Sequence, residues 1–143
     1  MSEVKEIKPI KVEPVIEIDP NKIAVKVAYL EKTAMSLSKL MIDGINASAY
    51  FAIKRLLALI TKDNNDFSAT REALCKQCSV LDEDGKAKIV DNEYQLKESE
   101  KEKFTKELNE LRNEDIIYDF KPISISKIND LPIDVYIASF FKE

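Results

Sequence analysis

The sequence predicts a mainly α-helical protein: a long helical hairpin and a third helix, with a small β-hairpin element and a short C-terminal helix. Three observations indicate this fold. Apolar residues recur at helical spacing through residues 23–81. Glycine occurs only twice in 143 residues, which argues against turn-rich β architectures. Apolar residues make up 45% of the chain, enough for one hydrophobic core. We expect an extended N-terminal arm over residues 1–20 and a single helical domain over residues 21–143.

The first predicted helix begins at Asp19-Pro20 and ends at Asp43-Gly44. Asp19 can cap the first free amides, and proline is well tolerated in a first turn. Glycine ends a helix without strain because it adopts positive φ readily. Between these signals, apolar residues alternate at spacings of four and three, as on the shared face of two packed helices. They are Ile23, Val27, Leu30, Ala34, Leu37 and Met41.

The second predicted helix begins near Asn46 or Ser48 and carries an apolar residue at every seventh position. These residues are Ile53, Ile60, Phe67, Leu74 and Leu81. The repeat crosses the polar run 62–66 without a change of phase, so we predict one continuous helix through it. At a rise of about 1.5 Å per residue it would be about 50 Å long. Its far half extends past the first helix and needs another partner, in this chain or in another subunit.

The second half of the domain is predicted to cover this far half. Residues 88–96 follow an acidic turn and indicate a small β-hairpin or a two-part loop. Ser99 and Glu102 have the spacing of a capping box and would open a third helix that ends near Arg112. Its apolar face, formed by Phe104, Leu108 and Leu111, would lie on the second helix.

Residues 116–120 and 123–125 are predicted to be short strands, and Pro122 favours a sheet edge or a bend between them. A short closing helix is expected to open at residues 130–132. It would carry Ile133, Ile137, Phe140 and Phe141. Aromatic residues of this kind more often belong to the core than to a binding surface. If the closing helix is exposed, however, Phe140 and Phe141 would form an apolar patch suited to a partner.

The N-terminal arm has two interpretations. Pro9 and Pro14 exclude a helix, and a flexible tail is common at a chain terminus. The arm is also rich in β-branched residues, more than a solvated tail needs, which favours an extended arm that adds to the edge of a partner's sheet. Its candidate partner-binding residues are Ile10, Val12, Ile16 and Ile18.

Composition excludes several classes of function. The formal net charge is −4 with both signs interspersed, so the chain lacks the clustered basic face of a nucleic-acid-binding protein. The most apolar stretch, residues 45–60, is shorter than the roughly 20 residues that span a bilayer, and no secretory signal is visible. We therefore expect no nucleic-acid partner and no membrane partner.

Catalytic and metal-binding motifs are also weak. Histidine is absent, which removes the usual nucleophile–base pairs and the commonest transition-metal ligand. Cys75 and Cys78 form a CxxC pair, but a zinc site needs four ligands; a core role is favoured, with a metal shared between subunits as the alternative. A calcium loop over residues 82–93 would place Lys86 in a ligand position and lacks the required glycine.

The carboxylates of the third helix are interleaved with lysines, an arrangement that gives neither the burial nor the shared charge that acid–base catalysis needs. We predict no catalytic residue, no cofactor, no resident metal and no small-molecule substrate.

The C-terminal half has a distinctive order of parts: an Asp84-Gly85-Lys86 turn, a Lys/Glu/Leu helix over residues 103–111, an acidic-to-apolar strand over 113–117, an Ile-x-Ile segment and a small terminal helix. In this order, over about residues 79–141, the chain resembles a family of small uncharacterised proteins of tailed bacteriophages. The resemblance implies a phage origin and an unassigned role, with no catalytic residue to transfer. The proline-containing arm departs from the compact start of such proteins and suggests an added docking function.

The function that we expect is non-catalytic. It is that of a bacteriophage structural or assembly-associated protein, which associates with itself and with other phage structural proteins in the cytoplasm of the infected bacterium or in the virion. The alternative is a small intracellular effector that binds and modulates a host enzyme. An enzyme is a third and weaker hypothesis.

Overall fold

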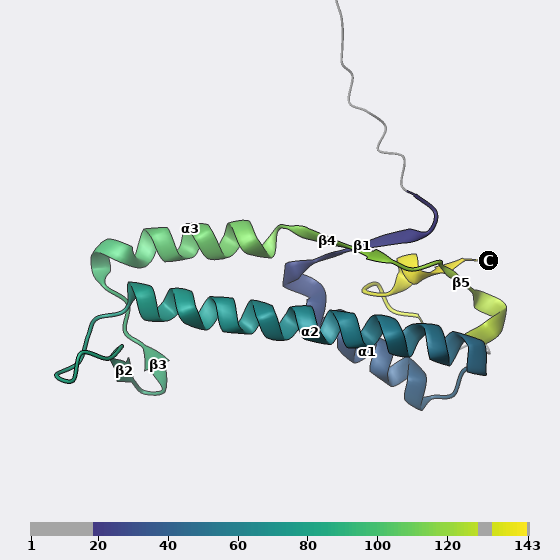
Figure 1. Ribbon diagram of the computed structural model, residues 1–143, viewed down its shortest axis with the longest axis horizontal. Coiled ribbons are helices and arrows are strands. Elements are labelled where there is room, and N and C mark those ends of the chain that lie inside the picture. The colour runs from purple at the N-terminus through teal and green to yellow at the C-terminus, as the bar shows by residue number, and fades with distance from the viewer. Residues whose placement is uncertain (1–18, 129–132, 143) are drawn as a thin grey trace, which may run out of the picture.

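The computed structural model describes residues 19–128 and 133–142, and it is mainly helical as predicted. The α-helices and the short 3₁₀ helices together account for 58% of the described residues. Figure 1 shows an elongated molecule in which one long helix, α2, runs along most of the length. The helices and strands are β1 (Lys22–Lys26), α1 (Leu30–Ile42), α2 (Ala47–Cys78), β2 (Ile89–Val90), β3 (Glu93–Tyr94), α3 (Lys101–Arg112), β4 (Asp115–Asp119), β5 (Ile123–Ser124) and β6 (Phe141–Lys142).

The long helix α2 is continuous, as its seven-residue repeat predicted. The side chain of Asn46 caps it by accepting a hydrogen bond from the Ala49 amide at 3.0 Å. Its 32 residues give a length of about 48 Å. The helix ends at Cys78, so Leu81 is not part of it. Leu81 instead forms an isolated β-bridge with Ala87, and its side chain is exposed.

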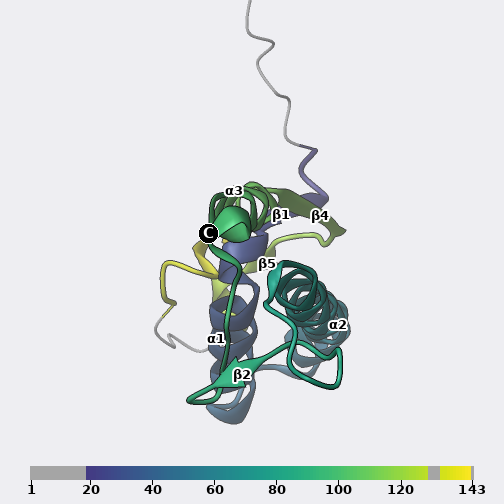
Figure 2. The ribbon, with the colours of Figure 1, turned by 90° about the vertical axis from the view of Figure 1, so that its left-hand side faces the viewer.

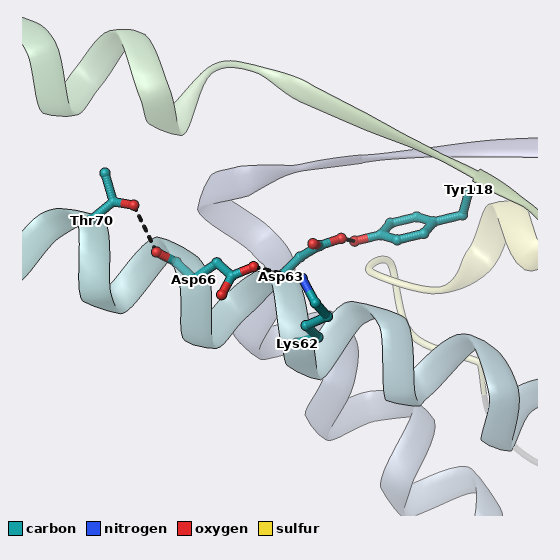
Figure 3. Close-up of polar contacts among 5 residues, drawn as sticks. All are labelled: Lys62, Asp63, Asp66, Thr70 and Tyr118. Atoms are coloured by element: carbon teal, nitrogen blue, oxygen red, sulfur yellow. Dashed lines mark hydrogen bonds and ion pairs between the residues drawn. The ribbon is translucent and has the colours of Figure 1, made fainter.

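Polar side chains in the middle of α2 are held by partners that leave the helix backbone intact (Figure 3). Lys62 Nζ lies 2.9 Å from Asp66 Oδ2, one turn further along. The Thr70 hydroxyl donates to the Asp66 carbonyl at 2.8 Å. Asp63 accepts a hydrogen bond from the Tyr118 hydroxyl of β4 at 2.6 Å. Short polar side chains break helices by competing for backbone groups. Asp63 and Asp66 have other partners, which explains why the polar run does not become a loop.

The predicted first helix is wrong in its first part, because residues 22–26 form strand β1 and α1 begins only at Leu30. The buried residues Ile23 and Val25 alternate with exposed ones, and such β-branched residues suit a half-buried strand. Ile23 and Val27 are also four residues apart, so they fit the spacing of a helix as well as that of a strand. The pairing of β1 with β4, a strand far along the chain, favours the strand.

β1 and β4 form an antiparallel two-stranded sheet that lies across one side of the α1–α2 pair (Figures 1 and 2). Ile23 lies opposite Tyr118 and Val25 opposite Ile116, and these residues face the helices. The other face carries Lys22, Ala24 and Lys26 opposite Asp119, Ile117 and Asp115. The core therefore lies between α1, α2 and this sheet, in one half of the molecule.

The C-terminal segment completes that core. In residues 133–142 the chain forms a 3₁₀ helix, Ala138–Phe140, and strand β6, which pairs in parallel with β5. The short C-terminal α-helix predicted here is therefore not formed over 133–142, and its predicted start at 130–132 lies outside the described residues. Phe140 is 1% exposed, and its ring centroid lies 5.8 Å from that of Phe120.

In the other half of the molecule, α3 lies along the far part of α2 (Figure 1). Leu108 of its apolar face is buried, and Phe104 and Leu111 are half-buried. The predicted capping box does not form, because α3 begins at Lys101 after a 3₁₀ turn and has no side-chain cap. The predicted β-hairpin is present as β2 and β3, joined by Asp91 and Asn92. Both joining residues have positive φ, as a type I′ turn requires.

Candidate interaction site

The structure describes only two of the predicted partner-binding residues, Phe140 and Phe141. Ile10, Val12, Ile16 and Ile18 lie outside the described residues. Phe140 and Phe141 are both core residues, so the exposed apolar patch that they would form on an exposed closing helix is absent here. Burial of both rings explains this, because removing two adjacent aromatic side chains from water is favourable and their rings fill the end of the core. The candidate site therefore lies elsewhere.

One edge of β1 is open. The Val27 amide donates to the Glu114 carbonyl at 3.0 Å, and the Phe120 amide donates to the Asn21 carbonyl at 2.9 Å. In an antiparallel ladder the hydrogen-bonded pairs alternate, so the odd-numbered residues of β1 direct their peptide groups to β4. The peptide groups of Lys22, Ala24 and Lys26 therefore point to the opposite edge. Among the described residues, no second strand pairs with that edge.

The chain enters β1 from the side of this open edge. The Asp19 carbonyl accepts a hydrogen bond from the Lys22 amide at 3.0 Å, and the Asp19 side chain accepts another from the Asn21 amide at 2.8 Å. Because the Lys22 amide points away from β4, Asp19 lies beside the open edge. The turn over residues 19–22 thus uses the Lys22 amide and places the end of the arm next to Ala24 and Lys26, with which no described strand pairs on this side.

A pocket of about 420 Å³ adjoins the same strand. Residues 24–26 of β1 form one wall, and the C-terminal segment forms another through Val135, Tyr136 and Ser139. Tyr29 and Thr33, at the start of α1, also line it. The Tyr29 and Tyr136 ring centroids are 5.7 Å apart. Aromatic rings with a polar edge suit a surface that is partly apolar and partly wet.

The Thr33 hydroxyl is the unusual polar group of this pocket. Thr33 is 1% exposed, and its Oγ1 has no hydrogen-bond partner among the described residues. Leaving a buried hydroxyl unpaired costs about 1–3 kcal/mol. The oxygen has almost no accessible surface, so it lies behind the wall of the pocket and not on it.

Charged residues frame the outer face of the sheet. Lys22 forms an ion pair with Asp119, and Lys26 Nζ lies 3.6 Å from Asp115 Oδ1. Between these two pairs lie Ala24 and the exposed Ile117. This face therefore offers a narrow apolar strip flanked by charges of both signs, and the open peptide groups of β1 run along its border.

The remaining sequence motifs do not form a site with this edge. Cys75 and Cys78 are both buried and free, and burial is the largest cause that raises the pKa of the Cys78 thiol. The Asp82 side chain accepts hydrogen bonds from the Asp84 amide at 2.8 Å and the Lys86 amide at 3.0 Å, so it supports its own turn. Within residues 19–128 and 133–142, no three potential metal-ligating side chains gather.

The Tyr118–Asp63 contact is an internal link between sheet and helix (Figure 3). Burial, and then the hydrogen bond to Asp63, raise the pKa of the Tyr118 hydroxyl above its ordinary value. Both effects keep the phenol protonated, so the pair suits a structural role and not proton transfer. Sequence reasoning missed this contact because its residues are 55 positions apart.

The strand β1 could have been found in the sequence, although its open edge could not. The alternation of Ile23, Val25 and Val27 with less apolar residues is a strand signal, and we gave the helical spacing more weight. The Thr33 hydroxyl carries no such signal, because a threonine at helical spacing among apolar residues is common in cores.

Comparison of the chain with models of protein families, with curated proteins and with solved structures finds no match. The resemblance to phage proteins therefore stays a prediction. In the part of the chain that the structure describes, no helix combines the length and the apolar character needed to cross a bilayer.

Proposed function

We propose that this chain is a non-catalytic interaction protein that self-associates and docks partners through its N-terminal arm. In the setting that the resemblance implies, it is a structural or assembly-associated protein of a bacteriophage. One observation carries the proposal: no described strand pairs with the edge of β1 at Ala24 and Lys26, and the arm joins the domain beside this edge. Open edges pair readily with other strands, and proteins usually cover or disrupt those that are not used for binding.

The pocket beside β1 adds support. Strand addition to a sheet edge draws affinity from backbone hydrogen bonds and specificity from pockets that receive alternate side chains. The edge of β1 offers both features, since residues 24–26 contribute to the edge and to the pocket wall. The β-branched residues of the arm have the composition that such a strand needs.

A second candidate is the small effector that binds a host enzyme, and a different surface favours it. Met35 and Ile42 are exposed, seven residues apart on the same face of α1, with Ile42 83% exposed. Exposed apolar residues that recur on one helix face suit a helix-binding groove of a partner protein. This surface is separate from the edge of β1, so the two functions can be tested separately.

Measurement of molecular mass in solution over a range of protein concentrations tests the proposal. We expect the full chain to be larger than its 16.3 kDa monomer. A full-length variant with aspartate at Ile10, Val12, Ile16 and Ile18 should be monomeric, because charged residues remove the apolar face of the arm. The matched control carries aspartate at Met35 and Ile42 and should keep the mass of the wild type.

A full chain that stays monomeric at every concentration would overturn self-association. Loss of association in the α1 control, with association kept in the arm variant, would move the interface from the arm to α1 and favour the second candidate.

A further inference from the structure

We infer that a basic hollow at the amino end of α2 binds a small molecule that carries a phosphate group. The hollow has a volume of about 360 Å³. Three lysines line it together with Ser48 and Ser124, and these lysines are Lys121, Lys127 and Lys142. None of the lining residues that the structure describes belongs to β1, so this inference goes beyond the proposed self-association and does not depend on it.

Backbone contacts hold the segments of the basic hollow together at one end of the molecule, where α2 begins and β5 lies (Figure 1). β6 pairs in parallel with β5 and places Lys142 opposite Ser124. The Asn46 amide, just before α2, donates to the Lys127 carbonyl at 3.2 Å. Lys121 lies in the connection between β4 and β5. The backbone therefore fixes where each lysine side chain begins, and an anion would have to order only the side chains themselves.

The basic hollow carries charge of one sign. Among the described residues that line it, none is acidic. None of its three lysines forms an ion pair within the described part of the chain, whereas both lysines of β1 pair with carboxylates of β4. Ammonium groups around one hollow repel one another, and the walls of a hollow strengthen their field. A multiply charged anion is therefore favoured there, and the net charge of −4 does not reveal such a local cluster.

The start of α2 adds to this field. Ser48 lies in the first turn of a 32-residue helix, and that turn contains no acidic residue. The Asn46 side chain accepts the hydrogen bond of the Ala49 amide. The other amides at the start of a helix have no helical partner, and the helix dipole makes this end partly positive, which favours phosphate. The lysines carry the inference, and the helix end supports the same ligand.

The shape of the basic hollow suits a small organic phosphate. Ala49 and Ala52 of α2 lie on one side, and Pro122 and Ile123 lie on the other, so the walls are apolar. Sites for small molecules typically measure about 300–1,000 Å³ and combine mostly apolar walls with a few polar groups, and the hollow is near the lower limit. The phosphate can contact the lysines while the organic part lies on the apolar walls. A nucleic-acid backbone would need a longer row of cations.

Calorimetric titration of the full-length protein with inorganic pyrophosphate at low ionic strength tests the site. We expect the wild type to bind, with a dissociation constant about tenfold higher or more in the hollow variant, because that variant loses three charge-assisted contacts. The hollow variant is Lys121→Gln/Lys127→Gln/Lys142→Gln. Its matched control changes three exposed lysines outside the hollow, has the same net charge and should bind as the wild type does. This control is Lys54→Gln/Lys88→Gln/Lys106→Gln.

The variant Ser48→Glu tests the hollow without removing a lysine. It places a carboxylate beside the ammonium groups, so the dissociation constant for pyrophosphate should rise by about tenfold or more. The carboxylate also lies in the first turn of α2, where it favours the helix, so the midpoint of urea denaturation should not fall. The matched control Ser68→Glu adds the same charge at an exposed position further along α2 and should bind as the wild type does.

Two-dimensional NMR of the full-length protein locates the bound anion. We expect pyrophosphate to shift the amide signals of Ser48, Ser124 and Lys142 most and to leave those of α3 unchanged. Shifts centred on another part of the chain would overturn the inference, because the anion would then bind elsewhere.

Weaker binding in the hollow variant and in Ser48→Glu, with binding kept in both controls, supports the inference. Equal weakening in the hollow variant and its lysine control would overturn it, because net charge alone would then explain the binding. No binding by the wild type at millimolar pyrophosphate would also overturn it. Single-stranded DNA that binds more tightly than pyrophosphate, and that the hollow variant loses, would overturn the small-molecule ligand and assign the lysines to a nucleic-acid backbone. None of these results changes the measurement of mass that tests self-association.

Discussion

The same seven-residue repeat is buried deeply in one half of the molecule and only partly in the other. The near half comprises α1, residues 47–60 of α2, the β1–β4 sheet and residues 133–142; the far half comprises residues 61–78 of α2, β2, β3 and α3. Ile53 and Ile60 are fully buried in the near half. Phe67 and Leu74 continue the repeat in the far half and are only half-buried. The repeat therefore sets which face of α2 is apolar, and the neighbouring elements set how deeply that face is buried.

The reason is the number of elements that surround α2. In the near half, α1 lies beside α2 and the sheet lies across the pair (Figure 2), and side chains of the C-terminal segment belong to the same hydrophobic cluster. In the far half, α3 and the ends of the hairpin segment cover it, and Cys75, Cys78 and Leu108 are the main buried side chains there. We therefore expect the near half to carry most of the free energy of unfolding and the far half to open locally first.

The largest effect should come from the near half. Phe140→Ala removes a ring that is 1% exposed and packs against Phe120, and it should lower the free energy of unfolding by about 3–5 kcal/mol. Urea denaturation followed by circular dichroism measures it. The matched control Phe51→Ala removes a ring that is 63% exposed and should change stability by less than about 0.5 kcal/mol. Equal effects would contradict the placement of Phe140 in the core.

The same substitution made in both halves sharpens the comparison. Leu37→Ala in the near half should cost about 3 kcal/mol, because Leu37 is fully enclosed. Leu108→Ala in the far half should cost about 2 kcal/mol, since the thinner packing around it can relax. Hydrogen exchange should show faster opening of α3 and the end of α2 in Leu108→Ala, with α1 unchanged. Uniformly faster exchange over α1 as well would show that the two halves unfold as one unit.

Sequence reasoning succeeded where one pattern extended over many residues. The continuity of α2 through the polar run, the β-hairpin at residues 89–94, the third helix and the strand at 115–119 all followed from periodicity and turn chemistry. It failed at residues 22–26, where helical and strand periods fit the same side chains and only a distant strand decides. It also failed for Leu81 and for the closing helix, where packing of the chain end overrides local preference.

The candidate site was predictable only in part. The β-branched residues of the arm predicted a segment that adds to a sheet edge. The edge of β1 that could accept it was not predictable, because an open edge depends on which strands pair across the whole chain. The Thr33 hydroxyl, which has no hydrogen-bond partner among the described residues, likewise owes its burial to the packing of separate segments of the chain.

The smallest predicted effect concerns the link between the sheet and α2. Tyr118→Phe removes the hydrogen bond to Asp63 and should lower stability by about 1 kcal/mol near pH 8. Because the pKa of Tyr118 is raised in the folded protein, the folded state holds this proton more tightly than the unfolded chain, whose tyrosines titrate near pH 10. The stabilisation is therefore fully present below pH 10 and is lost as the pH rises further.

Lysines also titrate in this range, so the informative quantity is the difference in free energy of unfolding between the wild type and Tyr118→Phe. It should be constant from pH 8 to about pH 10 and then fall, because the unfolded phenol ionises before the folded one. Asp63→Asn keeps an acceptor oxygen and removes the charge, so it should retain more of the stability near pH 8 than Tyr118→Phe does. A difference that stays level or grows above pH 10 would mean that water reaches the phenol, and the sheet would then be less firmly joined to α2 than the 2.6 Å contact indicates.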